Sequence, residues 1–150
     1  MEIDEIIKEL DEKLRITKKE KQENILNIYS ERETTPARCS YCGVESSKIH
    51  SRYKREIADL PIWQYKVKLI IEAKKYTCSN PECSHKRFAE MLPFAGERSK
   101  RTARVDEYIC EIGLKNSSLE AEKVIRKTHA DISNKTVLRV IKKSGERNQI

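Results

Sequence analysis

The chain has 150 residues, of which 37% are charged and 37% hydrophobic, and its formal net charge is +7. No stretch approaches the roughly 20 consecutive apolar residues that a membrane-spanning helix requires. The N-terminus, MEIDEIIKELDEKL, lacks the basic and then apolar order of a secretion signal. We therefore expect a soluble, cytoplasmic protein that keeps its thiols reduced and has no membrane partner.

The positive charge is unevenly distributed along the chain. Residues 1–33 hold 7 basic and 10 acidic side chains, whereas residues 34–150 hold 24 basic and 14 acidic ones. A basic body of this kind is typical of proteins that bind a polyanion, most simply nucleic acid. A lysine-rich solvated surface is the alternative interpretation.

The N-terminal segment predicts a helix. Ile3, Ile6, Ile7, Leu10 and Leu14 recur at helical spacing, so residues 3–15 are expected to form an amphipathic helix. Residues 17–23 are almost wholly polar and are interpreted as the end of that helix or a linker. Periodicity does not decide whether residues 24–30 form a strand or a second helix. Residues 1–36 are therefore predicted to be an N-terminal helix and linker.

Four cysteines in two pairs predict a structural zinc site. The pairs are Cys39-x-x-Cys42 and Cys78-x4-Cys83, and two tight turns of this kind can supply the four thiolates of a tetrahedral zinc ion. Two disulfides, or four unrelated buried thiols, are the alternatives, and His85 is an alternative ligand to one cysteine. The fifth cysteine, Cys110, is expected to be a small buried side chain of a helix.

The residues around the cysteine pairs predict three strands. These are residues 47–57, residues 65–77 and residues 86–92, with a turn at Leu60-Pro61. Trp63 and Phe88 are expected in the core. Residues 37–95 are thus predicted to be a small β-rich zinc ribbon whose metal supplies folding free energy that so small a core lacks.

Three helical patterns follow a basic linker at residues 96–104. The first, around Val105 to Ile112, is expected to stop at Gly113, and the second begins at Ser117. The third begins at Ser133 and ends at Gly145. Residues predicted on the apolar faces of the last two are Ala121, Val124, Ile125, Val137, Leu138 and Ile141. Residues 96–150 are therefore predicted to be a three-helix helix-turn-helix module, which makes the whole chain α+β.

A helix-turn-helix places the start of its later helix in the major groove of DNA. Asparagine and arginine there read base edges, and lysine and threonine bind phosphates. The alternative is a module that packs on another protein domain. The predicted contacts to double-stranded DNA are Arg98, Lys100 and Arg101 of the linker and Asn134, Lys135, Thr136, Arg139 and Lys142 of the third helix. Among these, Asn134, Lys135 and Arg139 are expected to face base edges, and the linker is expected to follow the backbone or a neighbouring minor groove.

No catalytic constellation is visible. The aspartates are scattered, whereas two-metal catalysis needs carboxylates that converge on two metal ions. No nucleophile–base pair and no small-molecule site is indicated, so an enzyme is the weakest reading of the chain. A different class of function is a protein-interaction module, in which the N-terminal stripe, Ile3 to Leu14, is a dimerisation helix.

The ordered motifs resemble one family. These motifs are Cys39-Ser-Tyr-Cys42-Gly43, His50-Ser51-Arg52-Tyr53-Lys54-Arg55, Asp59-Leu60-Pro61, Tyr76-x-Cys78-x4-Cys83, Arg87-Phe88-Ala89-Glu90-x-Leu92-Pro93 and Arg101-Thr102-x-Arg104. Over about residues 37–143 the chain resembles the N-terminal region of the ISL-three family of insertion-sequence transposases. Trp63-Gln64 stands where that family often has glycine.

The resemblance implies a function. In that family a zinc finger and a helix-turn-helix recognise the terminal inverted repeats of the element, and a separate C-terminal domain with acidic residues cuts and joins the strands. The chain is then expected to be the non-catalytic, zinc-dependent DNA-binding portion of such a transposase. The alternative is a regulatory zinc module that multimerises with a full-length transposase.

Overall fold

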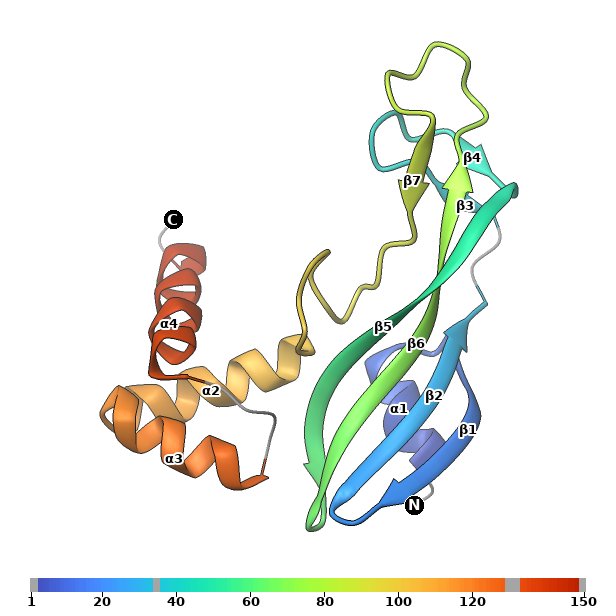
Figure 1. Cartoon of the computed structure of the whole chain (residues 1–150). Helices are drawn as coiled ribbons and strands as arrows, with labels where there is room; N and C mark the ends of the chain where they lie inside the picture. The colour runs from blue at the N-terminus through green and yellow to red at the C-terminus, as the bar shows by residue number, and fades with distance from the viewer. Residues whose placement is uncertain (1–2, 34–35, 129–132, 149–150) are drawn as a thin grey trace.

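The computed structural model describes residues 3–33, 36–128 and 133–148 and shows an α+β fold (Figure 1). The main sheet has the strand order β1-β2-β6-β5, and β7 also pairs with β6; β3 and β4 form a separate small sheet. The elements are α1 (Ile3–Leu10), β1 (Leu14–Gln22), β2 (Ile25–Arg32), β3 (Ala37–Arg38), β4 (Glu45–Ser46), β5 (Ile49–Ile62), β6 (Tyr65–Thr77), β7 (Arg87–Ala89), α2 (Ala103–Lys115), α3 (Ser118–Thr128) and α4 (Asn134–Asn148).

The N-terminal segment is a helix followed by a β-hairpin. Helix α1 ends at Leu10, so the expectation of a helix through residue 15 and a linker at residues 17–23 is wrong. Pairing with β2 overrides the polar composition of β1, whose exposed lysines suit an edge strand. Strand β2 in turn pairs in parallel with β6. The division into residues 1–36, 37–95 and 96–150 stays a prediction.

Strands β5 and β6 form a long antiparallel ribbon (Figure 1). Strand β6 has the predicted bounds, residues 65–77, whereas β7 is shorter than the predicted residues 86–92. The turn expected at Leu60-Pro61 is wrong, because β5 runs through both residues with a register shift between Asp59 and Ile62. Such an irregularity accommodates Pro61, which has no N–H for the ladder.

The chain reverses instead at Trp63-Gln64, between the paired residues Ile62 and Tyr65. Trp63 is 89% exposed, so its predicted place in the core is wrong, whereas Phe88 is buried as expected. The alternation of apolar residues along a strand does not predict the exposure of Trp63, because Trp63 lies in the turn between the strands and not on either face of the sheet.

The main core lies between α1 and the sheet. Ile7 of α1 is fully buried against strand residues, and Ile3 and Leu10 pack at its edge. The apolar stripe that suggested a dimerisation helix is therefore used inside the molecule. The buried members of this core are Ile7, Leu14, Leu26, Ile28, Ile57, Val67, Leu69, Ile71, Leu92, Phe94 and Ala95.

Helices α2, α3 and α4 share a second core. Its buried members are Val105, Ile109, Ala121, Ile125, Val137 and Val140. Leu138 is 55% exposed and Val124 is 41% exposed, so their predicted place on the apolar faces is wrong. The connection between α3 and α4 at residues 129–132 lies outside the described residues. In the part that the structure describes, no helix has the length and apolarity needed to cross a bilayer.

Two predicted helix ends are also wrong. Helix α2 continues through Gly113 to Lys115, and α4 continues through Gly145 to Asn148. A Cβ at Gly113 would lie 2.4 Å from Ile141 Cδ1 and 3.2 Å from Val137 Cγ1. Gly113 therefore allows α2 and α4 to approach closely, which is a packing role and not the predicted terminating role.

A buried carboxylate fastens the helices to the sheet. Asp59 of β5 is 2% exposed and accepts hydrogen bonds from Thr102 Oγ1 at 2.8 Å and Arg104 Nε at 2.7 Å. A second guanidinium N–H of Arg104 also donates to Asp59. Two motifs about 40 residues apart, Asp59-Leu60-Pro61 and Arg101-Thr102-x-Arg104, thus meet where α2 begins.

Candidate metal centre and nucleic-acid interface

Two tight turns bring the four paired cysteines together. Cys39 and Cys42 lie between β3 and β4, where the Cys39 N–H bonds Val44 O at 3.0 Å and the Gly43 N–H bonds Cys39 O at 2.9 Å. Gly43 has a φ of 78°, which glycine adopts without strain. Cys78 and Cys83 lie between β6 and β7, where the Cys78 N–H bonds Lys86 O at 2.8 Å.

The sulfur geometry fits a tetrahedral metal ion. The four Sγ atoms lie within 4.8 Å of one another, with Cys39–Cys83 at 4.0 Å and Cys42–Cys78 at 3.5 Å. Four Zn–S bonds of about 2.3 Å in a tetrahedron place sulfurs about 3.8 Å apart. All four cysteines are free thiols, which removes the disulfide alternative. The arrangement supports a structural zinc site in a zinc ribbon.

The pKa values of the cysteine thiols also favour a bound metal ion. The backbone N–H of Val44 is the main cause that lowers the pKa of Cys42 to about 6. The N–H of Asn80 acts to lower the pKa of Cys78, but burial and the neighbouring sulfurs outweigh it and raise this pKa to about 12. One thiolate thus opposes the ionisation of the next. A divalent cation removes that repulsion and favours four thiolates.

Two pairs of stacked aromatic side chains lie at the cysteine turns. Tyr76 and Phe88 stack with their ring centroids 5.4 Å apart and pack with Cys39 in a small buried cluster. His85 stacks on Tyr41 with centroids 3.5 Å apart, so it joins the two turns. The ligand atoms that lie close enough together to bind one metal ion are those of the four cysteines, and His85 is not among them.

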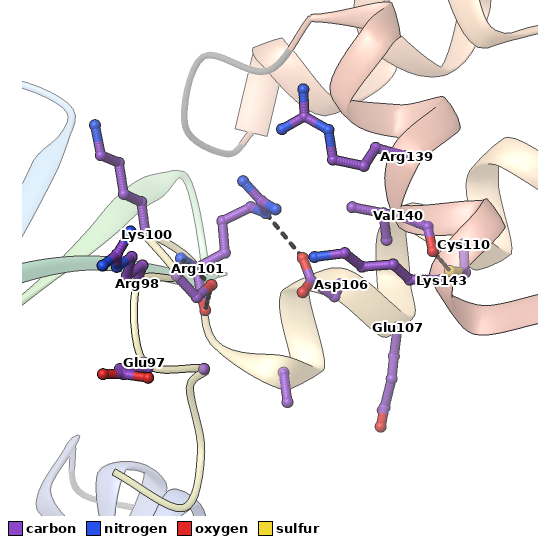
Figure 2. A pocket seen from close by; sticks show the side chains of 13 residues that line it. Glu97, Arg98, Lys100, Arg101, Asp106, Glu107, Cys110, Arg139, Val140 and Lys143 are labelled. Atoms are coloured by element: carbon purple, nitrogen blue, oxygen red, sulfur yellow. Dashed lines mark hydrogen bonds and ion pairs between the residues drawn. The ribbon is translucent and has the colours of Figure 1, made fainter. Parts of the chain in front are cut away.

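A second candidate site is a groove of about 530 Å³ between the basic linker, α2 and α4 (Figure 2). Its cations come from the linker and from α4, and its carboxylates come from the linker and from α2. The charged residues that line it are Arg98, Lys100, Arg101, Arg139 and Lys143, together with Glu97, Asp106 and Glu107. In Figure 2, Arg139 and Lys143 extend from α4 toward Arg101 and Asp106, whereas Glu107 points away.

The linker is held in place beside β5. Ala58 donates its N–H to Lys100 O at 2.8 Å, and Thr102 donates to Ala58 O at 3.0 Å. The Arg101 side chain bonds Asp106 at 2.8 Å. Within the described part of the chain, the other four cations of the groove have no ion pair. The groove therefore presents an excess of uncompensated positive charge.

The structure brings only some of the predicted DNA contacts to this groove. Arg98, Lys100, Arg101 and Arg139 line it, whereas Asn134, Lys135, Thr136 and Lys142 do not. Sequence reasoning did not select Lys143, although its spacing of one helical turn from Arg139 is a usable signal. It also missed the contact of Asp59 with Thr102 and Arg104, because no local pattern connects those segments.

The start of α4 is capped as predicted. Ser133 Oγ accepts the N–H of Thr136 at 3.2 Å, and Ser133 O accepts the N–H of Val137 at 3.1 Å. The N–H of Asn134 donates to Glu122 Oε2 of α3 at 3.0 Å. The bond to Glu122 ties the start of α4 to α3, and the side-chain acceptors satisfy N–H groups that the helix itself cannot.

Comparison with known proteins identifies the family resemblance. Residues 35–83 match the family model described as the zinc-finger of transposase IS204/IS1001/IS1096/IS1165. A 96-residue segment, 64% of the chain, is 28% identical to the transposase for insertion sequence element IS1001 of Bordetella parapertussis. That alignment spans 23% of the relative's length. No solved structure matches the chain.

These matches confirm the resemblance to ISL-three transposases that the motifs indicated. The matched zinc-finger segment contains all four clustered cysteines, so sequence similarity and sulfur geometry agree on a transposase-type zinc ribbon with a structural Zn²⁺.

Proposed function

We propose that this chain is the zinc-dependent DNA-binding portion of an insertion-sequence transposase and that it recognises the terminal inverted repeats of its element. In this proposal α2, α3 and α4 act as a helix-turn-helix, and α4 is the helix that reads the DNA. The single observation that carries the proposal is the convergence of linker and α4 cations in one groove.

The charge of the groove suits a phosphate backbone. Arg98 and Lys100 reach it from the linker, and Arg139 and Lys143 reach it from α4. If Arg98, Lys100, Arg101 and Lys143 neutralise phosphates while Arg139 reads a base, the logarithm of the binding constant would fall by about 3 to 4 per decade of salt concentration. Asp106 restrains Arg101 and gives the groove a fixed geometry.

The exposed face of α4 supplies the candidate base contacts. Lys135, Arg139 and Lys142 are exposed and recur at a spacing that places them on one helix face. Thr136 is half-buried, and its hydroxyl lies 3.2 Å from Ser133 Oγ, so it is less available. Arg139 lies both on this face and in the groove, which makes it the main candidate to bridge guanine O6 and N7.

The zinc site acts as a scaffold in this proposal. Cys39, Cys42, Cys78 and Cys83 hold the metal and join the turn between β3 and β4 to the ends of β6 and β7. Catalysis belongs to another part of the transposase, because strand transfer needs converging carboxylates.

The decisive experiment measures DNA binding by fluorescence anisotropy over a range of salt concentrations. The probes are a duplex that carries the inverted repeat flanking the gene and a scrambled duplex of equal length. The purified protein, loaded with zinc, should prefer the repeat. Failure to bind either duplex at low salt would refute the proposal.

Substitution separates base reading from phosphate binding. Arg139→Ala should weaken binding to the repeat by about 10- to 100-fold and binding to the scrambled duplex much less. Lys123→Ala is the matched control, because Lys123 is an exposed cation of α3 that does not line the groove. Equal losses on both duplexes would remove Arg139 from the base-reading residues.

A further inference from the structure

Two turns lie side by side at one end of the main sheet. The first, between β1 and β2, contains Glu23 and Asn24, and the second, between β5 and β6, contains Trp63 and Gln64. Lys66 donates its N–H to Asn24 O at 2.8 Å, which fixes the turns to each other. Figure 1 shows this end of the sheet opposite the cysteine turns. Residues 21–24 and 63–65 are called the double turn below.

Of the two residues of the double turn with a positive φ, Glu23 and Trp63, it is Trp63 that carries an aromatic side chain. It is 89% exposed and has a φ of 55°, a conformation that a bulky side chain rarely adopts. It stands at the first position of a two-residue hairpin loop, where glycine or asparagine is favoured. The indole thus buries little area against its own chain and strains the backbone. A strained, exposed aromatic side chain of this kind motivates a search for an external ligand.

The neighbours of Trp63 indicate the chemistry of that ligand. Gln22, Asn24 and Gln64 are exposed amides, which donate and accept hydrogen bonds to base edges. Lys21 is an exposed cation whose Nζ lies 3.4 Å from Tyr65 Oη and 5.2 Å from the centre of the Tyr65 ring. Glu23 is the acidic member of the double turn. An aromatic side chain surrounded by amides and a lysine is the combination with which proteins read the minor groove or stack on exposed bases.

The position of the double turn suits the same ligand as the groove. Trp63 follows Asp59, the residue that fastens α2, by four positions, or about 13 Å of strand. One helical turn of DNA is about 34 Å long. A duplex in the groove that runs toward this end of the sheet would therefore reach the double turn within one helical turn.

We propose that the double turn is a second DNA contact, in which the indole of Trp63 stacks on a base that is unpaired or partly unstacked. The inference rests on the proposed DNA-binding function and adds a ligand class, the exposed base face, to a site outside the helices. The amides fix the base edge, and Lys21 lies where it meets the flanking phosphate.

Trp63 is the only tryptophan of the chain, so its fluorescence reports on this contact alone. The zinc-loaded protein is titrated at low salt with a blunt duplex and with the same duplex carrying a short single-stranded overhang. Stacking on a base should quench the fluorescence strongly. Stronger quenching by the overhang identifies an unpaired base, and equal quenching by both identifies insertion between paired bases.

Variants test whether the contact contributes to affinity. Trp63→Gly suits the positive φ and should fold as well as the wild type, yet bind the preferred DNA about 5- to 100-fold more weakly. Trp63→Phe should retain most of the affinity because the ring still stacks. Leu114→Ala is the control, since Leu114 is 75% exposed and lies on α2. It should bind as the wild type does.

The possible failures are distinguishable. DNA binding detected by anisotropy with unchanged Trp63 fluorescence and an unaffected Trp63→Gly variant overturns the stacking inference and leaves the proposed function intact. That result would also be expected if the double turn contacts another protein. A protein that binds neither DNA probe at low salt overturns both.

Discussion

The contact between Asp59 and the start of α2 leads to a quantitative prediction. Asp59 is 2% exposed and Thr102 is fully buried, whereas the Arg104 side chain is 24% exposed. Replacing Asp59 by alanine leaves the Thr102 hydroxyl without this partner, at about 1–3 kcal/mol, and removes charge-assisted hydrogen bonds to Arg104. Because Arg104 reaches water, its loss is smaller than for a fully buried pair. We expect Asp59→Ala to lower the free energy of unfolding by about 3 kcal/mol.

The assay is urea unfolding of the zinc-loaded protein followed by circular dichroism, because the exposed Trp63 reports poorly on folding. Glu56→Ala is the matched control on the same strand. Glu56 pairs with Lys68 at 3.9 Å, but the two side chains are 66% and 43% exposed, so its removal should cost less than about 0.5 kcal/mol.

A double-mutant cycle tests the cause of the loss. Asp59→Ala and Arg104→Ala should together cost clearly less than the sum of the single variants, because the second change removes a group that the first has already left without its partner. Additive losses would refute the reasoning, since they would show that the two side chains stabilise the fold independently. A loss below about 0.5 kcal/mol for Asp59→Ala would refute it too.

Other parts of the structure carry predictions of their own. Zinc removal by a chelator should speed hydrogen exchange at the amides of the cysteine turns while the amide of Leu69 stays protected. The reason is that cysteines of both turns belong to a small cluster separate from the main core that contains Leu69. Unfolding of the whole protein on zinc removal would contradict this. Gly113→Val should destabilise the protein by about 2 kcal/mol through its clash with Ile141, compared with the exposed control Leu114→Val, in the same urea assay; equal losses would refute close packing. Ser133→Ala should cost about 1 kcal/mol, because the N–H of Thr136 loses its acceptor, and an unchanged midpoint would contradict it.

The metal site was predictable because its information is local. Each cysteine pair lies within one turn, and Gly43 and Asn80-Pro81 indicate those turns by residue type. The spacing did not show that the two cysteine pairs would lie next to each other. The fold brings the pairs together, because the pairing of β5 with β6 and of β6 with β7 places both turns at one end of the sheet.

The N-terminal hairpin was not predictable, because long-range contacts determine it. Arg32 of β2 is buried and pairs with Asp11, lies 3.8 Å from Glu90, and donates to Met91 O at 3.0 Å. Such a buried charge network joins residues that are 21 to 59 positions apart. A polar strand such as β1 gives no periodic signal of its own, so composition alone favoured a linker.

Helix boundaries failed for a related reason. Glycine at position 113 has the residue type of a helix end, but the approach of α4 decides its role. Leu138 is a second example. It is apolar and follows the buried Val137, so its pattern predicts a core position, yet its side chain is 55% exposed. The periodicity of one segment predicts that a helix forms, but it does not predict which other elements that helix packs against.

The β5–β6 ribbon has the metal site at one end and the attachment of the helices near the other. Strand β5 has 14 residues, or about 45 Å from end to end, and the cysteine turns lie beyond its start. Asp59 fastens the helices only a few residues from the opposite end. Even so, Glu97 of the basic linker lines both the groove between α2 and α4 and a second pocket whose walls include Ser40 and Tyr41 of the Cys39–Cys42 turn. We therefore expect the zinc ion to fix the ends of β6 and β7, and with them the path of the chain into the basic linker.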